Sequence, residues 1–524
     1  MRTEHANISR RVGTVSFFTL ISRILGLARD AVLAWAFGAT RFADAFYVAF
    51  RIPNLLRRLV AEGALTIAFV PIYTENLARS REEGKRAASV VFTYLSIFLA
   101  LLAIVGVIGA PLLVRLIAWG FTASPEKFEI TVFLTRLMFP YIVLISLVAL
   151  AMGILNSLKH FAAPAASPVL LNIFIIFGAL VLDKHFSVPA EGVAVGVILG
   201  GIAQLALQIP PLWREGMLPR LDFNWRHPAL KGLLVLMIPS AFGAAVYQFN
   251  VVVVTFLASF LPDGSVSYLW YADRVSEFSL GIFSIAVATV TLPTLSDHAI
   301  KKDTGAFKET LRYSLKLAFL IDIPAAVGLY ILALPVVSVL FQRGEFTPEA
   351  AVASAGALCF FAVKIPFVSG VRNLVPAFFA LKDAKTPVAV SIVAVIVNAA
   401  FALVLMKSML HRGLAAALVI SAIVNFFLLL WLLRKKIGLL GCRDIIKSVV
   451  RTSFASALMG IVIYLALNNI RFESSLSIFA RGGMLLALVA GGAVIYIGII
   501  RVISPTEFHA LAALMRRRVA STVK

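Results

Sequence analysis

The chain has 524 residues, of which 60% are hydrophobic and only 14% are charged, a composition typical of a polytopic membrane protein. Its formal net charge of +22 would indicate a nucleic-acid partner in a soluble chain, but here it is consistent with Lys and Arg gathered in cytoplasmic loops near anionic lipid head groups. Two cysteines cannot form a disulfide framework, and the seven histidines show no metal-ligand spacing. The composition therefore excludes a soluble protein, and we expect no nucleic acid, metal or other cofactor.

Apolar runs long enough to cross about 30 Å of hydrocarbon recur along the whole chain. We predict an all-α membrane protein with about fourteen transmembrane helices, near residues 12–37, 42–74, 88–114, 129–157, 165–183, 190–213, 231–261, 266–297, 313–341, 350–380, 386–406, 411–433, 446–468 and 478–502. The first run carries Arg23, Arg29 and Asp30 without a small-residue cleavage signal, so we expect a retained helix and not a signal peptide.

The connecting loops predict the orientation. With the N-terminus in the cytoplasm, the inner connections hold about 29 Lys and Arg against about 9 in the outer ones, a strong positive-inside bias. We therefore expect both termini on the cytoplasmic side.

The stretch from Ser22 to Glu62 combines apolar character with many charges, namely Arg23, Arg29, Asp30, Arg41, Asp44, Arg51, Arg57, Arg58 and Glu62. An arginine at mid-bilayer costs about 2.5 to 3.5 kcal/mol unless it faces a water-filled cavity or a partner. Apart from Arg41 in the turn, the arginines outnumber the carboxylates, which leaves positive charge unpaired. Because the planar guanidinium matches phosphate in bidentate fashion, these residues predict a cavity for a phosphate-bearing anion.

Helical spacing places Arg51, Arg58 and Glu62 on one face and Arg57 on another, and Pro53 is expected to bend this helix. Two alternatives stay open. Arg57 and Arg58 can snorkel to the membrane interface, and Arg29 can form a structural salt bridge with Asp44 or Glu62.

The segment YADRVSEF brings further charges into the second half of the chain. Arg274 and Glu277 share a helical face, and Asp273 is placed to pair with Arg274 or with an arginine of the first half. We expect Asp30 and Glu277 to pair with cations and not to contact an anion.

Weak sequence repeats divide the chain. Pro125 is matched by Pro348, Lys159 by Lys382 and Pro164 by Pro387, and all three pairs have the same offset along the chain. We therefore predict a lobe at 1–220, a second at 221–440, and two added helices with a cytoplasmic tail at 441–524. Parallel repeats with an even number of spans place a transport substrate at their interface, the arrangement of alternating access.

Four stretches carry a family resemblance: SRILGLARDAVLAWAFGA from Ser22, RIPNLLRRLVAEGALTIAFVP from Arg51, YADRVSEF from Tyr271 and FQRGEFT from Phe341. They closely resemble the MurJ (MviN) family of bacterial lipid II flippases, within the multidrug/oligosaccharidyl-lipid/polysaccharide (MOP) exporter superfamily. The resemblance covers the whole length, including the last two helices.

The resemblance implies a two-lobe bundle in the bacterial inner membrane that moves the polyprenyl-diphosphate disaccharide-pentapeptide of peptidoglycan synthesis to the periplasmic leaflet. It implies that Arg23, Arg29, Arg57 and Arg274 bind the substrate head group. The expected supporting or gating residues are Asp30, Asp44, Arg51, Arg58, Glu62, Asp273 and Glu277. The expected partners are lipid II, membrane lipids and the cell-wall synthesis machinery. Whether a monovalent cation is coupled to transport is left open by the sequence.

Two rivals are weighed against this function. A sibling MOP exporter of drugs or another polyprenyl-linked oligosaccharide would share the fold, but a cationic-drug exporter needs an acidic cavity. A membrane-embedded glycosyltransferase needs an acidic metal cluster or a catalytic carboxylate on a substantial loop, and the sequence provides neither. We therefore expect a transporter without catalytic residues.

Overall fold

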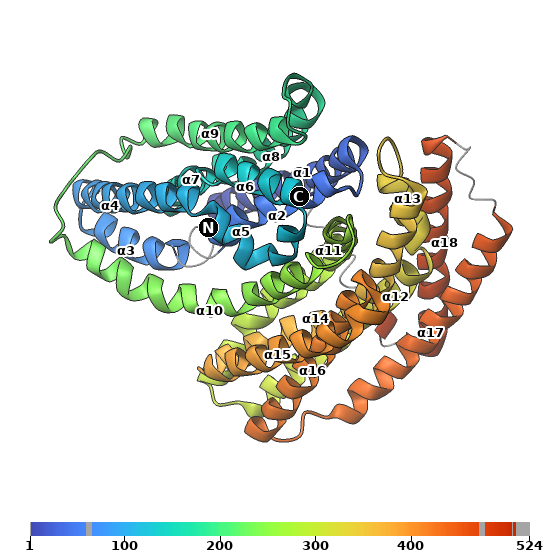
Figure 1. The fold of residues 1–524 in the computed structure, drawn as a ribbon. Helices are drawn as coiled ribbons and strands as arrows, with labels where there is room; N and C mark the ends of the chain where they lie inside the picture. The colour runs from blue at the N-terminus through green and yellow to red at the C-terminus, as the bar shows by residue number, and fades with distance from the viewer. Residues whose placement is uncertain (1, 59–64, 471–476, 506, 510–524) are drawn as a thin grey trace. The chain divides into compact units, whose positions relative to one another are not determined.

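The computed structural model describes residues 2–58, 65–470, 477–505 and 507–509, and all regular secondary structure within them is helical (Figure 1). The chain forms two compact units. The first contains Met1–Ser267 and Arg343–Phe346, and the second contains Tyr268–Gln342 and Thr347–Lys524.

The first unit is a bundle of helices. These are α1 (Arg2–Phe37), α2 (Arg41–Leu56), α3 (Thr66–Arg79), α4 (Arg81–Ile108), α5 (Ala110–Ala118), η2 (Trp119–Ala123), α6 (Pro125–Met138), α7 (Tyr141–Ser157), α8 (Ala162–Phe177), η3 (Gly178–Leu182), η4 (Asp183–His185), α9 (Glu191–Arg214) and α10 (Pro228–Ala258). Helix α8 packs between α1 and α9, α2 packs on α6, and α3 packs on α4, α7 and α10. Helix α10 packs in the first unit, and the lobe boundary at residue 220, which comes from the sequence repeat, stays a prediction.

Close packing in the first unit is illustrated by α4 and the end of α6. Gly106 lies directly under the buried ring of Phe139, and an added Cβ would overlap the ring. The ring belongs to an apolar cluster that includes Leu99 and Ala103 of α4. Glycine is therefore required here by the approach of the ring, because no larger residue fits without displacement.

The second unit contains α11 (Ser265–Ile300), of which the first three residues belong to the first unit, followed by α12 (Thr304–Ile331), α13 (Ala333–Phe341), α14 (Pro348–Ala380), α15 (Lys385–Met409), α16 (His411–Ile437), α17 (Cys442–Asn469) and α18 (Ile478–Ile503). One apolar cluster joins α12, α14 and α16. A second joins α12 to α17 and α18.

The helix bounds repeat along the chain. Helix α12 has the same length as α4, α13 has the same length as α5, and both follow their counterparts at one constant offset. The turns after α7 and α14 also correspond, since Lys159 and Lys382 have left-handed φ values of 65° and 58°. In both turns the next N–H donates five residues back, His160 to Leu155 at 2.8 Å and Asp383 to Phe378 at 2.9 Å, which is the Schellman pattern.

Ten helices within the described residues are long and apolar enough to cross a membrane, so this is a multi-pass membrane protein. Four predicted runs each contain two helices: 42–74 (α2 and α3), 88–114 (α4 and α5), 129–157 (α6 and α7) and 313–341 (α12 and α13). Gly109 ends α4, and Pro140 follows α6 without an N–H to continue its hydrogen-bond ladder. Hydropathy does not register such interruptions because the flanking residues stay apolar.

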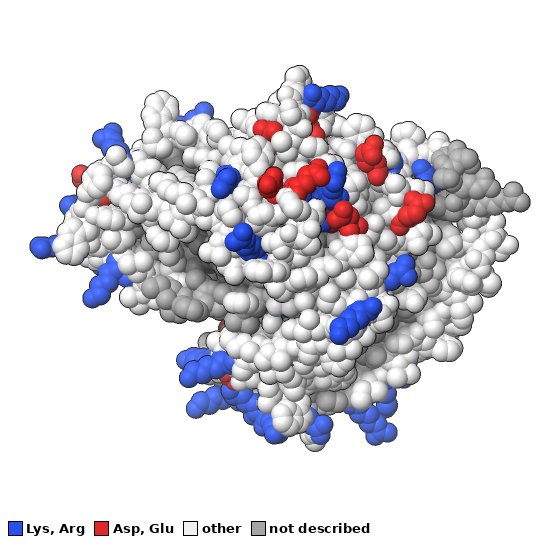
Figure 2. Space-filling view, viewed as in Figure 1, with Lys and Arg blue, Asp and Glu red and all other residues white. Residues whose placement is uncertain are grey.

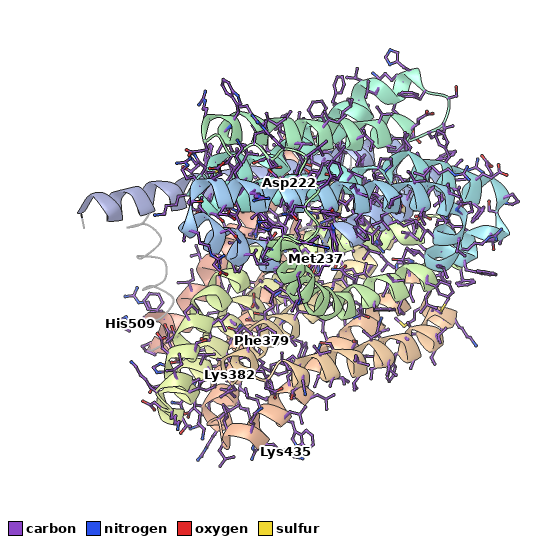
Figure 3. The ribbon with its side chains drawn as sticks, turned by 90° about the vertical axis from the view of Figure 1, so that its left-hand side faces the viewer. Asp222, Met237, Phe379, Lys382, Lys435 and His509 are labelled. Atoms are coloured by element: carbon purple, nitrogen blue, oxygen red, sulfur yellow. The ribbon has the colours of Figure 1, made fainter. Side chains whose placement is uncertain are left out.

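The segment joining α9 to α10 runs along α4. The backbone N–H groups of Arg220 and Asp222 donate to Ser89 Oγ at 3.1 Å and Thr93 Oγ1 at 2.9 Å, and Figure 3 labels Asp222 beside this helix. Figure 2 shows Lys and Arg gathered at the left-hand end of this unit. Exposed basic residues lie at or near the ends of α3, α4, α9 and α10 and in the segment between α9 and α10, among them Arg79, Arg81, Arg86, Arg214, Arg220, Arg226 and Lys231.

Candidate functional site

The first polar cluster of the candidate site lies where α1 packs against α8. The Arg29 guanidinium donates to Asp30 Oδ1 from Nε at 3.1 Å and from Nη2 at 2.7 Å, and its Nη1 donates to Asn172 Oδ1 at 3.1 Å. Arg29 is 9% exposed and Asp30 2%. The Asn172 amide donates to the Ser22 carbonyl at 3.1 Å. Arg29 is therefore a buried cation held in a fixed orientation by a carboxylate and an amide.

Arg23 lies two turns before Arg29 on α1 and is partly buried. Within the part of the chain that the structure describes, it makes no ion pair. A guanidinium on an otherwise apolar helix without a carboxylate partner favours an anionic guest.

The arginines of α2 and of the turn that follows it hydrogen-bond to polar side chains of the first unit. Arg51 donates to Thr255 of α10, and Arg57 Nε donates to Asn54 Oδ1 at 2.9 Å. Helix α2 ends at Leu56, and Arg57 and Arg58 lie in a π-helical turn. The backbone at Arg57 remains right-handed helical, with φ −56° and ψ −48°, and the face predicted to hold Arg51, Arg58 and Glu62 stays a prediction. Glu62 lies outside the described residues.

Asp44 is the centre of a second buried cluster. Its carboxylate accepts from Lys127 Nζ at 2.9 Å, the Gly264 N–H at 2.8 Å, and the N–H and hydroxyl of Ser267 at 2.9 and 2.7 Å. Asp44 is 1% exposed and Lys127 4%. Lys127 also donates to Asp263 at 2.7 Å. The pairing of Arg29 with Asp44 that the sequence left open is not formed, since Lys127 neutralises this carboxylate.

In the second unit, α14 supplies cations to the carboxylates of α11. Lys364 Nζ lies 3.4 Å from Asp273 Oδ1, and Arg372 Nη2 lies 3.9 Å from Glu277 Oε1. Within its own unit, Asp273 thus has a lysine as its partner. Arg274 stacks over Trp270, with its Cζ 4.4 Å from the ring centroid, a geometry that orients the guanidinium.

The sequence missed the residues that complete these clusters: Lys127, Asn172, Lys364 and Arg372. A charged residue inside an apolar run was the available signal for Lys364 and Arg372, whereas Lys127 lies just before the run at 129–157. Their partners lie 83 or more residues away in sequence, so spacing could not pair them. Within the described residues, no group of His, Cys, Asp or Glu side chains could hold a metal ion.

Solved structures indicate the class of fold. A multidrug resistance MATE family transporter of the MOP superfamily, in an inward-facing conformation, aligns with a TM-score of 0.67 at 17% identity, covering 80% of this chain and 95% of that one. At this identity the likeness concerns the fold alone. The fold is that of the MOP-superfamily transporters.

Sequence comparisons then give the family. A family profile described as lipid II flippase MurJ matches residues 33–482. The lipid II flippase MurJ of Burkholderia cenocepacia is 39% identical over 435 residues, 82% of this chain and 84% of that protein. The probable lipid II flippase MurJ of Haemophilus influenzae is 34% identical over 94% of this chain and 99% of its own length. A solved lipid II flippase MurJ in an inward closed conformation aligns with a TM-score of 0.79 at 27% identity, covering 93% of this chain and 98% of that one. The chain belongs to the lipid II flippase MurJ family, which confirms the resemblance drawn from its motifs.

Proposed function

We propose that this protein is a flippase that moves lipid II, the undecaprenyl-diphosphate-linked disaccharide-pentapeptide, from the cytoplasmic to the periplasmic leaflet. The observation that carries the proposal is the similarity to lipid II flippases over most of the chain, at 39% identity across 82% of it in one relative. The chemistry is consistent, because the head group carries a diphosphate and the apolar helices α1 and α2 carry buried and half-buried guanidinium groups.

The proposed head-group ligands are Arg23, Arg29, Arg57 and Arg274. Asp30 and Asn172 hold Arg29 in place, and Trp270 supports Arg274. In this proposal Asp44, Arg51, Arg58, Glu62, Asp273 and Glu277 are supporting or gating residues that keep the surrounding helices in register. No bond of the substrate is made or broken, so the protein acts as a transporter and not as a catalyst.

The proposed architecture has fourteen spans, which counts each broken pair of helices as one span. The helix bounds that recur at a constant offset support two pseudo-symmetric lobes at 1–220 and 221–440, with two further helices and a tail at 441–524. The exposed basic loops support an orientation with both termini in the cytoplasm of a bacterial inner membrane. Lipid II and membrane lipids are the proposed partners, together with the cell-wall synthesis machinery.

Membrane potential is the proposed energy source, with no cofactor. A head group with several negative charges that moves outward gains about 2.3 kcal/mol per charge for each 100 mV of inside-negative potential. The same potential favours the return of an emptied, positively charged cavity toward the cytoplasm. The membrane potential therefore favours both the outward movement of the loaded carrier and the return of the empty carrier.

Rescue of a flippase-depleted bacterial host tests the function, with lipid II in the outer leaflet measured directly. The unaltered chain is expected to restore growth and outer-leaflet lipid II. Arg23→Ala, Arg29→Ala, Arg57→Ala and Arg274→Ala are each expected to abolish rescue at near-normal protein level. Arg136→Ala is the matched control, because the exposed Arg136 lies in a span and outside the proposed site. Rescue without lipid II movement, or activity in most of the four variants, contradicts the proposal.

A further inference from the structure

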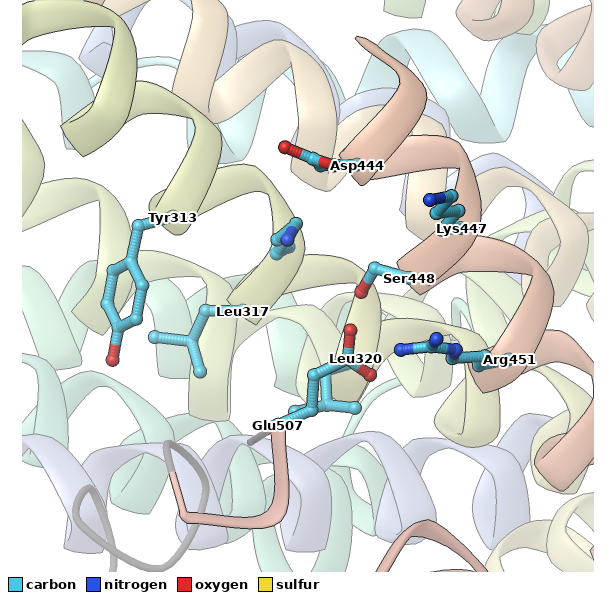
Figure 4. A pocket seen from close by; sticks show the side chains of 9 residues that line it. Tyr313, Leu317, Leu320, Asp444, Lys447, Ser448, Arg451 and Glu507 are labelled. Atoms are coloured by element: carbon cyan, nitrogen blue, oxygen red, sulfur yellow. The ribbon is translucent and has the colours of Figure 1, made fainter. Parts of the chain in front are cut away.

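A cavity of about 470 Å³ lies in the second unit between α12, α17 and the segment after α18. Figure 4 shows α12 and α17 contributing opposite walls, with Glu507 at one end. Its lining residues are Tyr313, Lys316, Leu317, Leu320, Asp444, Lys447, Ser448, Arg451 and Glu507. None of them belongs to the proposed head-group site.

The lining is cationic. Lys316, Lys447 and Arg451 face two carboxylates, Asp444 and Glu507. Asp444 is already shared, because Arg312 Nη1 donates to its Oδ2 at 3.4 Å. Three cations therefore remain against one carboxylate, which leaves net positive charge inside the cavity.

A buried hydroxyl adds a hydrogen-bond donor to these cations. Ser448 is 2% exposed, and its Oγ has no hydrogen-bond partner among the described residues. It lies between Lys447 and Arg451 in sequence and lines the same cavity. A buried polar atom without a partner is costly, and an acceptor oxygen of a ligand would satisfy it. Ammonium, guanidinium and hydroxyl donors around one space are the ligands of a phosphate group.

The depth of the cavity distinguishes a lipid phosphate from a soluble one. Lys447 and Arg451 lie five and nine residues after Cys442, the first residue of α17, or about 8 to 14 Å along the helix. For a helix of 28 residues centred in the bilayer, this depth is just inside the boundary between head groups and hydrocarbon, from which long Lys and Arg side chains reach lipid phosphates. On the far side of Leu320, the apolar cluster continues through Ala455 and Met459, so the cavity is polar at the interface and closed by apolar side chains toward the membrane interior.

We propose that this cavity binds the phosphate group of an anionic membrane phospholipid, with Lys316, Lys447, Arg451 and Ser448 as its ligands. Glu507 limits the affinity, because its carboxylate lines the same space as the phosphate. The site lies within one unit and does not involve the transported substrate. A test of this lipid site therefore does not depend on the proposed flippase activity.

Binding of phosphatidylglycerol to the full-length protein in neutral detergent micelles tests the proposal, with native mass spectrometry as the readout and phosphatidylcholine as the neutral comparison. The triple variant Lys316→Gln, Lys447→Gln, Arg451→Gln is expected to weaken phosphatidylglycerol binding more than about tenfold, because each cation near a lipid surface contributes a factor of several. The control triple variant Arg214→Gln, Lys231→Gln, Lys301→Gln, which removes exposed charges elsewhere, is expected to change it less than about twofold. Equal losses in the two folded variants, or equal binding of phosphatidylcholine, overturn the proposal.

Glu507→Gln provides a second variant with the opposite expected effect. Removal of its negative charge is expected to raise phosphatidylglycerol affinity severalfold, and an unchanged or lower affinity overturns the proposal even where the triple variant does not fold. Soluble glycerol phosphate is then added as competitor. A lipid site is expected to retain phosphatidylglycerol under a hundredfold excess of glycerol phosphate, whereas full displacement assigns the site to a soluble phosphate and overturns the lipid assignment.

Discussion

At the scale of single residues, the buried charges of the first unit divide into those neutralised within the protein and those available to a ligand. Asp44 and Lys127 neutralise one another and meet further partners in Gly264, Ser267 and Asp263. Arg23, in contrast, has no ion pair within the described residues. Replacing a residue of the first group is therefore expected to lower stability, whereas replacing a residue of the second group is expected to lower transport activity.

Asp44→Asn is expected to lower the stability of the folded protein by about 3 to 5 kcal/mol, because it leaves the buried Lys127 ammonium without its best partner. Thermal unfolding of the purified protein in detergent measures the effect. Arg41→Gln is the matched control, since it breaks the nearby but exposed Arg41–Glu126 pair, for which about 0 to 1 kcal/mol is expected. Similar losses in the two variants would contradict the assignment of Asp44 to a structural cluster.

Arg29→Lys is expected to restore little of the activity lost in Arg29→Ala. Lysine keeps the charge but cannot donate simultaneously to Asp30 and Asn172 in the geometry of the guanidinium fork. Outer-leaflet lipid II in the depleted host measures this, with Arg136→Lys as control. Full activity of Arg29→Lys would mean that charge alone is required.

The charged residues of α1, α2 and α11 could be identified from the sequence because a charge within an apolar run is itself a signal. The residues that pair with these charges could not be identified from the sequence. Arg29 meets Asn172 across 143 residues, and Asp44 meets Ser267 across 223. Only the packing of helices brings these atoms together, and no local spacing encodes it.

At the scale of helices, the contact between α4 and Phe139 is a test of close packing. Gly106→Ala is expected to cost about 1 to 3 kcal/mol, because its Cβ would overlap the buried Phe139 ring. Gly498→Ala on α18 is the control, since a Cβ there meets nothing within 4 Å, and it is expected to raise stability by up to about 1 kcal/mol. A Gly106→Ala protein as stable as the control would show that the ring can move aside.

The turn after α14 carries a pH-dependent interaction. Asp383 accepts from Lys436 Nζ and Thr386 Oγ1, both at 2.7 Å, and the hydrogen bond from Lys436 is the main reason that the pKa of Asp383 is lowered to about 2. A carboxyl with a lowered pKa stabilises the fold above its unfolded pKa of about 4, and this contribution is lost as pH falls through about 2.

Asp383→Asn is therefore expected to lower the unfolding temperature at pH 6 and to have a much smaller effect at pH 2. Thermal unfolding of both proteins across this range measures the difference. A gap that stays constant with pH would contradict the role of the ionised carboxylate. Asp222→Asn serves as the control in the first unit, because its partner Arg86 lies at 3.6 Å and is exposed.

The helical runs and their constant repeat offset could be predicted because hydropathy and repeated residues are properties of the chain itself. The points at which one apolar run is divided into two helices could not be predicted from the sequence. The π-helical turn at Arg57 and Arg58 depends on packing around α2, and the assignment of α10 to the first unit depends on its contacts with α3, α4 and α5. The cavity between α12 and α17 was equally hidden, because its cations belong to separate runs.

At the scale of the whole molecule, residues 343–346 follow α13 in the chain but pack in the first unit. The Glu345 N–H donates to the Trp35 carbonyl at 3.0 Å. Gly38 and Gly344 both have positive φ, 60° and 57°, and an added Cβ on either would overlap a carbonyl oxygen of the opposing segment. Glycine at both positions allows this backbone contact.

Under the proposed alternating-access cycle, we expect the segment 343–346 to separate from α1 as α13 and α14 move, so a disulfide between Trp35→Cys and Glu345→Cys is expected to stop lipid II transport. The backbone hydrogen bond from Glu345 to Trp35 holds the two segments in contact, and formation of the disulfide is checked first because its geometry is specific. Outer-leaflet lipid II is measured before and after reduction, and reduction is expected to restore it. Full transport with the disulfide closed would instead support a static groove for the head group.

The partners of Asp44 are synthesised at different times. Lys127 follows Asp44 by 83 residues, whereas Gly264 and Ser267 follow it by 220 and 223. A ribosome that has translated only as far as α9 has therefore delivered to the translocon the ammonium that neutralises Asp44, but none of the donors from the turn after α10.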